Sequence, residues 1–308
     1  MEKKIIVAID GSTHSDNSLS YIIKLFAKEQ ESHFHLTSWI TNAATIMPTI
    51  ADSKNSLIPN EGQNKKEAVT RRYLNQALRQ LQDAGIDSER IETSIELSGA
   101  AIADSIQHQA EKELADAIVI GRRGLNGISE MLMGSVSTTL FRNCHSTPLW
   151  IIDGEIEYKD FLVPVDGTVF SLLAVDHLAH ILKNREDLRI SLFHCTALLG
   201  KKSTCKPELF YENWDKEWCD TYLSGEDCLF NGPKQLLLEA GIPEVNIQIL
   251  PEKTDLEEGH GIVREAKIQK CGTVVLGRRE AKIAKGFFGG VSDRTIKQAQ
   301  NMALWIVG

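Results

Sequence analysis

Hydrophobic positions along the chain alternate between short continuous runs and longer stretches with helical spacing. In the first half, the continuous runs are residues 4–9, 33–40, 91–97, 117–120 and 149–152. Between them, residues 15–30 and 66–84 repeat apolar side chains every three or four positions, as a helix with one buried face does. This alternation predicts a parallel sheet of five strands with helices on both of its faces.

Two connections in this pattern stand out. Residues 41–63 lack a firm period and contain Pro48, Pro59 and Gly62, so we expect a long, mobile connection. The corresponding stretch of the second half, residues 200–233, is rich in aromatic residues and cysteine. It is too aromatic for a solvated loop, and we expect it to pack on the other half or on a second chain.

The two halves of the chain repeat one another. The strand and turn that end in Asp10-Gly11-Ser12 recur in a segment that ends in Asp166-Gly167-Thr168, 156 residues later. The triplet Gly121-Arg122-Arg123 returns at the same offset, whereas Gly134 and the closing strand at 149–152 return after 155 residues. We therefore predict a tandem duplication, with domains at 1–154 and 155–308.

Length and composition agree with two folded domains. The chain has 308 residues, of which 42% are hydrophobic and 25% charged, with a net charge of −8. The acidic balance disfavours wholesale binding to nucleic acid or to an anionic membrane. No run approaches the ~20 apolar residues of a membrane span, and the N-terminus leads directly into a strand rather than a signal peptide, so we expect a cytoplasmic protein.

The six cysteines form no C-x-x-C pair. We expect reduced thiols, buried or partly buried, and leave open a redox or metal role for the group in the second half. This group consists of Cys195, Cys205, Cys219 and Cys228. Nearby His194 and the sequence Gly259-His260-Gly261 match no standard set of metal ligands.

Candidate chemistry lies where strands end, because ligands of such sheets bind beyond the carboxyl ends of the strands. Asp10-Gly11-Ser12 follows the first strand, and Gly121 and Gly124 follow the fourth. Gly134-Ser135 opens the last helix, whose free N–H groups and dipole favour an anion. The spacing indicates a phosphate site, although it is neither the G-x-G-x-x-G nor the G-x-x-x-x-G-K-[ST] pattern.

The pattern Gly121-x2-Gly124-x9-Gly134-Ser135, together with the Asp10 turn, resembles the nucleotide motif of the universal stress protein family. The resemblance covers each half once, as in tandem members of that family. It implies two Rossmann-like α/β domains with strand order 3-2-1-4-5 and an adenine nucleotide (ATP, ADP or AMP), with or without Mg²⁺. The site residues that it implies are Ala8, Ile9, Asp10, Trp39, Ile120, Gly121, Arg123, Gly124, Gly134, Ser135, Val136 and Ser137.

Each of these residues also has a plain structural interpretation. The glycines could close a strand-to-helix turn, Asp10 could be the N-cap or a turn residue before the first helix, and Trp39 could be a half-buried strand aromatic. Arg122 and Arg123 could be a solvated pair, since the same pair recurs in the second half. These alternatives stay open at this point.

The second half departs from the motif. Glu280 replaces its second glycine, the spacing to Gly289 is one residue shorter, and Gly290 stands in place of Ser135. A carboxylate repels a triphosphate, and the missing hydroxyl removes a donor. We therefore predict that the first half binds nucleotide and the second binds it poorly or not at all.

The motif binds without an evident catalytic group, since no general base or pair of metal-binding carboxylates accompanies it. We expect a stress-response regulator or sensor with little or no catalysis. The alternatives are an interaction scaffold without nucleotide, a weak ATPase, and a ligase or kinase. RNA binding through a G-x-x-G loop is disfavoured because Gly121 follows a strand. Pairing of the closing strands predicts an internal pseudo-dimer, and a homodimer or a protein partner is a further expectation.

Overall fold

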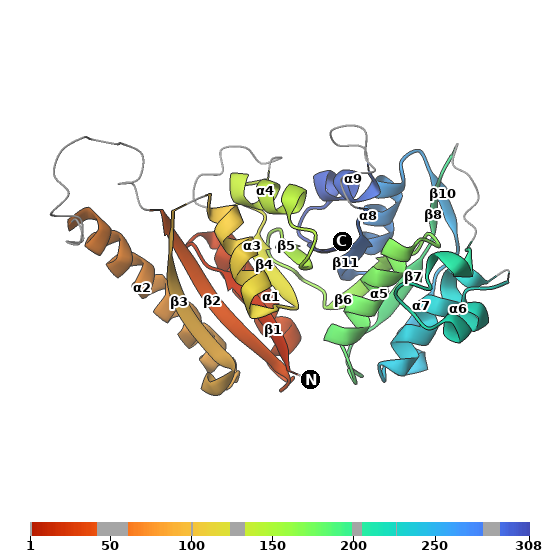
Figure 1. The fold of residues 1–308 in the computed structure, drawn as a ribbon, viewed down its shortest axis with the longest axis horizontal. Helices are drawn as coiled ribbons and strands as arrows, with labels where there is room; N and C mark the ends of the chain where they lie inside the picture. The colour runs from red at the N-terminus through yellow and green to blue at the C-terminus, as the bar shows by residue number, and fades with distance from the viewer. Residues whose placement is uncertain are drawn as a thin grey trace. The chain divides into compact units, whose positions relative to one another are not determined.

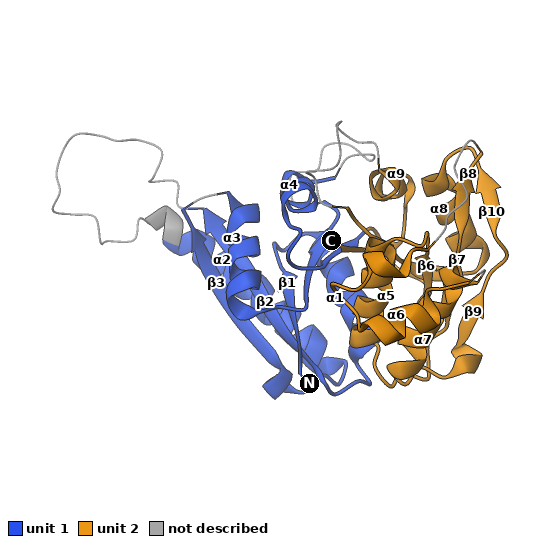
Figure 2. Ribbon diagram, turned by 45° about the vertical axis from the view of Figure 1, so that its right-hand side comes forward, with its two compact units in different colours: residues 1–152 blue, residues 153–308 orange. Residues whose placement is uncertain are grey.

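The structure is a computed structural model that describes residues 2–41, 61–99, 101–123, 133–198, 205–225, 227–279 and 290–308. The chain divides into two compact units, Met1–Ile152 and Asp153–Gly308, shown in blue and orange in Figure 2. We describe each unit by itself. Within the described ranges, no helix combines the length and the apolar character needed to cross a bilayer.

Unit 1 is a parallel sheet in the strand order β3-β2-β1-β4-β5, with helices between successive strands (Figure 1). The predicted α/β class and strand order are confirmed. Its elements are β1 (Lys3–Ala8), α1 (Thr13–Phe26), β2 (Ser32–Thr41), α2 (Glu61–Asp83), β3 (Ile91–Ser98), α3 (Ile102–Glu113), β4 (Ala117–Gly121), α4 (Ser135–Asn143) and β5 (Leu149–Ile152).

Helices cover both faces of this sheet. Phe34 of β2 packs against Phe26 of α1, with ring centroids 5.7 Å apart. The next residue, His35, bonds instead to Glu113 of α3. Because successive strand residues point to opposite faces, α1 and α3 lie on opposite sides of the sheet. Phe26 also stacks on the fully buried Trp150 of β5 at 6.1 Å, so one ring of α1 contacts side chains of both β2 and β5.

The two predicted helices are present, with one end of each shifted by several residues. Ser12 caps α1 by accepting a hydrogen bond from the backbone N–H of Ser15, and the helix ends at Phe26, before the predicted end at residue 30. Residues 61–63, expected in the long connection, belong to α2. The rest of that connection, residues 42–60, lies outside the described residues.

Unit 2 repeats the same topology in the strand order β9-β7-β6-β11-β12, again with parallel pairs. A separate parallel pair, β8 with β10, has no counterpart in the predicted five strands. The elements are β6 (Asp160–Pro164), α5 (Val169–Ile181), β7 (Ile190–Phe193), β8 (Cys195–Ala197), α6 (Lys216–Tyr222), α7 (Cys228–Glu239), β9 (Ile247–Ile249), β10 (Lys253–Asp255), α8 (Glu258–Ile268), β11 (Cys271–Gly277), α9 (Val291–Gln298) and β12 (Ala303–Val307).

The aromatic segment of unit 2 packs on its own unit. A Cβ at Gly232 of α7 would touch Leu223 and would lie 3.6 Å from the Trp218 ring, so α6 approaches α7 closely at this glycine. The sequence predicted packing on the other half or on a second chain and did not include this contact within the unit, so that expectation stays a prediction. The contact within the unit is local: residues 205–225 fold back onto α7, the helix that follows them in the chain (Figure 1).

The expectation of reduced thiols is wrong for two cysteines. Cys205 and Cys228 form a disulfide, with Cα atoms 6.0 Å apart, because the fold-back brings residue 205 to the first residue of α7. Cys144, Cys195, Cys219 and Cys271 are free thiols, and burial raises the pKa of Cys271 to about 11.

Candidate functional site

The turn after β1 is built by Asp10, Gly11 and Ser12. One carboxylate oxygen of Asp10, Oδ1, accepts a hydrogen bond from the Ser12 backbone N–H at 2.9 Å, and Gly11 adopts a φ of +75°. Unit 2 builds the same turn, in which Asp166 Oδ1 accepts from the Thr168 backbone N–H at 3.0 Å. The recurrence shows that this aspartate holds the turn in each unit, as the structural interpretation predicted.

The glycine that ends β4 is required by helix packing. A Cβ on Gly121 would lie 2.8 Å from the Cβ of His14 and 2.9 Å from its carbonyl oxygen, in the first turn of α1. In unit 2, a Cβ on Gly277 would collide with the Phe170 carbonyl of α5. Both glycines therefore let a helix approach the strand end. Because both units have this glycine, Gly121 alone is no sign that unit 1 binds a nucleotide and unit 2 does not.

The start of α4 is fixed at the carboxyl end of β4. The Ser137 hydroxyl donates to the Gly121 carbonyl at 2.8 Å, and the Gly134 N–H donates to the Arg122 carbonyl at 2.8 Å. Since β4 pairs in parallel with β1, the first turn of α4 and the Asp10 turn both lie at the carboxyl ends of neighbouring strands. Gly124, a predicted member of the site, is among residues 124–132, which lie outside the described residues.

The N-terminus of α4 carries no cap from a described side chain. Its N-cap is Gly134, with an extended backbone (φ −60°, ψ 158°) and no side-chain hydrogen bond from the described residues. The backbone amides of Ser135, Val136 and Ser137 start the helix there. Amides in this position, at the positive end of the helix dipole, favour a phosphate or another anion.

Unit 2 differs at this point. The corresponding helix, α9, begins after Gly290, and Asp293 Oδ2 accepts a hydrogen bond from the Gly290 N–H at 3.2 Å. Ser292 repeats the role of Ser137, donating to the Gly277 carbonyl at 3.1 Å. By the 155-residue offset, Asp293 corresponds to Thr138, so the second unit has a carboxylate at the helix start where the first has a hydroxyl.

Sequence reasoning missed Asp293, although its signal was present: a carboxylate three positions after the N-cap can accept a hydrogen bond from the N-cap N–H, which is one half of a capping box. Glu280 and Gly289, on which the prediction for the second half rested, lie outside the described residues. Two unit charges of the same sign about 4 Å apart repel each other by about 4 kcal/mol near a protein surface. Asp293 thus disfavours a phosphate at α9 independently of Glu280.

At the other end of the candidate site, Trp39 is half-buried near the carboxyl end of β2. Its indole Nε1 is buried and has no hydrogen-bond partner among the described residues, although buried indoles usually have one. Ala8 is half-buried, and Ile9 and Ile120 are buried, at the ends of the neighbouring strands β1 and β4.

An aromatic residue that sequence reasoning did not select lies beside the turn that follows β1. The Tyr73 ring of α2 lies against Gly11, where a Cβ would come within 2.6 Å of it. The Tyr73 hydroxyl lies 3.1 Å from the Ser38 hydroxyl and donates to Thr70 Oγ1 at 3.0 Å. No local pattern marks Tyr73, because the contact depends on how α2 crosses the sheet.

The two arginines after β4 are not a solvated pair. Arg122 is 3% exposed, and its backbone N–H donates a hydrogen bond to the Ile152 carbonyl at 2.8 Å. The same backbone bond recurs from Arg278 to Val307 in unit 2. Arg123 is half-buried. The first arginine of the pair therefore belongs to the repeated framework of the sheet, and only Arg123 remains a candidate for phosphate.

A polar cluster beside this site ties β2, β3 and α3 together. The buried His35 ring bonds through Nδ1 to Glu113 Oε2 at 3.0 Å and through Nε2 to the Ser94 hydroxyl at 2.9 Å. The order of these groups is that of a serine hydrolase triad, but Lys4 and Gln109 also bind the Glu113 carboxylate. We therefore assign the cluster to stability. Although burial opposes ionisation, these hydrogen bonds together lower the pKa of Glu113 to about 2.

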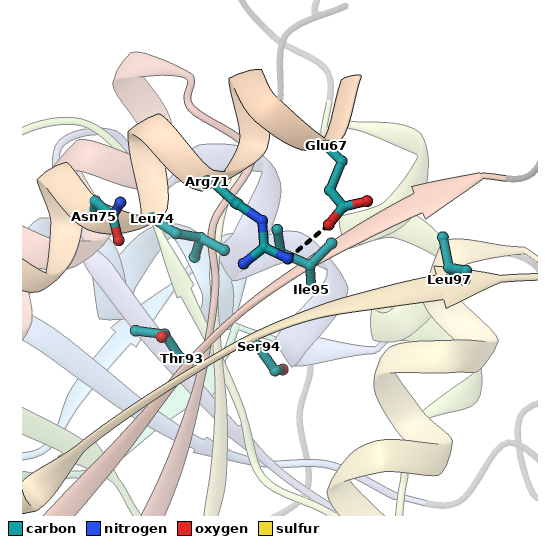
Figure 3. Close-up of a pocket in the computed structure, with 8 residues that line it drawn as sticks. All are labelled: Glu67, Arg71, Leu74, Asn75, Thr93, Ser94, Ile95 and Leu97. Carbon is teal, nitrogen blue, oxygen red and sulfur yellow. Dashed lines mark hydrogen bonds and ion pairs between the residues drawn. The ribbon is translucent and has the colours of Figure 1, made fainter. Parts of the chain in front are cut away.

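A surface pocket lies between α2 and β3 (Figure 3). Its volume is about 310 Å³, and its lining includes an ion pair between Arg71 and Glu67 of α2 at 2.6 Å. Leu74, Ile95 and Leu97 contribute apolar walls. None of the residues predicted for the nucleotide lines it. Among the described residues, no group of three or more histidine, cysteine or acidic side chains is arranged to hold a metal ion.

Comparison with known proteins now decides the family. A model described as the universal stress protein family matches residues 1–152 and, a second time, residues 157–306. The chain belongs to this family. The predicted tandem arrangement is thereby confirmed.

Individual relatives of this universal stress protein agree. Universal stress protein YxiE of Bacillus subtilis (strain 168) is 31% identical over 147 residues, covering 44% of this chain and 90% of YxiE. Universal stress protein Sll1388 of Synechocystis is 29% identical over 151 residues, covering 47% of this chain and 95% of its own. The crystal structure of a universal stress protein from Archaeoglobus fulgidus matches 99% of this chain and 95% of its own with a TM-score of 0.64 at 14% identity, a likeness of fold.

Proposed function

We propose that unit 1 of this universal stress protein binds an adenine nucleotide and that unit 2 does not. The observation that supports this most directly is the difference between the two equivalent helix starts. In α4 the first turn has no cap from a described side chain, whereas in α9 Asp293 already bonds to the Gly290 N–H. An anion is therefore favoured at α4 and disfavoured at α9.

The residues of unit 1 fit such a ligand. The backbone at Gly134, Ser135, Val136 and Ser137 would hold phosphate, with Arg123 as the charged side chain and Gly124 nearby in the chain. Ala8, Ile9, Asp10, Trp39, Ile120 and Gly121 would contact adenine and ribose. Trp39 Nε1, which has no hydrogen-bond partner within the described ranges, supports a polar ligand at that end. Mg²⁺, where the nucleotide carries it, would come with the phosphates.

The biological role that follows is a stress-response sensor or regulator in the cytoplasm, whose conformation or partner depends on the bound nucleotide. Hydrolysis would be slow and incidental, because the start of α4 offers amides and hydroxyls rather than a general base. The internal pseudo-dimer and a homodimer of whole chains stay predictions.

A second candidate is an interaction scaffold that binds no nucleotide. It is favoured by the structural tasks of Gly121, Asp10 and Ser137, each of which is repeated in unit 2. If those residues serve only the fold, the motif would be retained in a protein that binds no nucleotide. The two candidates differ in the number of nucleotides bound per chain.

The test combines extraction with calorimetry. Denaturing extraction of freshly purified protein should release one adenine nucleotide per chain, and ATP titration of the emptied protein should show one site. Thr138→Asp, which imitates Asp293, should weaken ATP binding at least about tenfold, equivalent to 1.4 kcal/mol. Asn143→Asp, at the exposed far end of α4, adds the same charge and should change affinity little.

Several outcomes contradict the proposal. Unchanged affinity in Thr138→Asp would remove the start of α4 from the site. Two nucleotides per chain would refute the asymmetry, and no binding at millimolar ATP would favour the scaffold.

A further inference from the structure

A ladder of aromatic rings runs along α6 in unit 2. Trp218 and Tyr222 lie four residues apart in α6, on one side of the helix, and Trp214, just before the N-cap Asp215, continues the row. The Trp214 and Trp218 rings are 6.4 Å apart and nearly parallel, at 23°, and the Trp218 and Tyr222 rings are 5.3 Å apart. All three side chains are half-buried, so each ring keeps part of its surface in solvent.

The buried side of this ladder is fixed in place. The fully buried Phe210 packs against Trp214 at 6.1 Å, and Trp218 Nε1 donates to Glu239 Oε1 of α7 at 2.9 Å. The disulfide from Cys205 to Cys228 closes the segment that carries the ladder. The exposed ring surface is therefore pre-organised, which lowers the entropic cost of binding a partner.

The surroundings of the rings are acidic. Between Lys206 and Gly225 the chain has five carboxylates and two lysines. The carboxylates are Glu208, Glu212, Asp215, Glu217 and Asp220, all exposed. Electron-rich ring faces beside exposed carboxylates attract cations and repel nucleic acid and anionic lipid.

A lysine of the same segment already makes a cation–π contact with a neighbouring ring. The ammonium of Lys216 lies 5.7 Å from the centre of the Tyr211 ring. The Tyr211 hydroxyl donates to Asp220 Oδ1 at 2.5 Å, a hydrogen bond that raises the pKa of Tyr211 to about 12. This arrangement of ammonium, ring and carboxylate is the contact that a lysine or arginine of a partner would repeat over the other rings.

We propose that this surface, the α6 aromatic face, binds a basic peptide segment of a partner protein. Arginine or lysine side chains of the segment lie over Trp214, Trp218 and Tyr222 and pair with the carboxylates of Glu212 and Glu217. The proposal does not depend on nucleotide binding, because every residue that carries it lies in unit 2, far along the chain from the motif of unit 1.

The test uses an eight-residue peptide of alternating arginine and glycine, titrated into the full chain with its disulfide intact and followed by calorimetry. Binding should be measurable at low salt and should weaken as salt is added. Trp214→Leu should reduce affinity about fivefold, as expected for one cation–π contact of about 1 kcal/mol. A peptide of alternating glutamate and glycine should not bind.

A matched pair of charge variants separates a specific surface from the general acidity of the chain. Glu212→Gln with Glu217→Gln removes two charges beside the rings, and Glu92→Gln with Glu96→Gln removes two exposed charges from β3 in unit 1. The first pair should weaken binding several-fold and the second should leave it nearly unchanged. Equal losses from both pairs, or full affinity in Trp214→Leu, would overturn the proposal. The charge pair keeps it testable should the tryptophan variant fold poorly.

Discussion

Replacing Glu113 by glutamine should remove an acid-sensitive part of the stability of unit 1. The Glu113 carboxylate accepts hydrogen bonds from three groups: Lys4 Nζ at 2.8 Å, His35 Nδ1 at 3.0 Å and Gln109 Nε2 at 3.0 Å. These bonds hold its pKa at about 2, against an ordinary value of 4.5. The carboxylate is therefore more stable in the folded unit than in the unfolded chain.

The size of this effect follows from the two pKa values. At 1.36 kcal/mol per pKa unit, the shift is worth about 3 kcal/mol of folding free energy at neutral pH. Because the folded pKa is the lower one, the stabilisation is fully present above pH 4.5 and is lost as the pH falls toward 2. Linkage gives a loss of about 2 kcal/mol between pH 7 and pH 3. Screening of Lys4, which is 36% exposed, makes these values upper estimates.

The assay is urea unfolding at pH 7 and pH 3, followed by circular dichroism and tryptophan fluorescence. Glu113→Gln should lower the free energy of unfolding at pH 7, and its deficit relative to the parent chain should shrink as the pH falls. Glu92→Gln, an exposed acid on β3, serves as the control and should run parallel to the parent. A deficit that is the same at both pH values would refute the assignment of the lowered pKa to Glu113.

Three further predictions concern single contacts. Ser137→Ala should lower the stability of unit 1 by about 1 kcal/mol in urea unfolding, since it removes a hydrogen bond to the Gly121 carbonyl; no change would mean that the bond contributes nothing. Gly121→Ala should cost about 1–3 kcal/mol in the same assay, because its Cβ meets His14; wild-type stability would show that α1 shifts freely. Alkylation of the unfolded, unreduced protein should label four of the six cysteines, and reducing the Cys205–Cys228 disulfide should destabilise unit 2 by about 3 kcal/mol; six labelled thiols would contradict the disulfide.

The features that the sequence predicted are local or repeated. Periodicity located the strands and two helices of the first half, and the repeat placed Asp166 and Gly277 at strand ends equivalent to those of Asp10 and Gly121. The family resemblance followed from these landmarks because they are short motifs at fixed spacing. The strand order, which joins segments far apart in the chain, was implied by that resemblance and not by the landmarks themselves. The assignment of site residues to a nucleotide stays a prediction.

The features that could not be predicted depend on contacts between distant segments. The cluster around Glu113 joins residues from a strand and a helix that are 78 positions apart, and no periodicity marks such a pair. The packing of His14 on Gly121 depends on how closely α1 approaches β4, which sequence alone does not fix. The disulfide was missed because its two cysteines become neighbours only when residues 205–225 fold back onto α7.

In α9 the carboxylate of Asp293 lies at the positive end of the helix dipole and accepts a hydrogen bond from the Gly290 N–H. We therefore expect the stability of unit 2 not to vary with the concentration of a small anion. If unit 1 binds its nucleotide as proposed, the ligand raises the free energy of unfolding of unit 1 alone. One polypeptide would then contain a unit whose stability depends on ligand concentration and a unit whose stability does not.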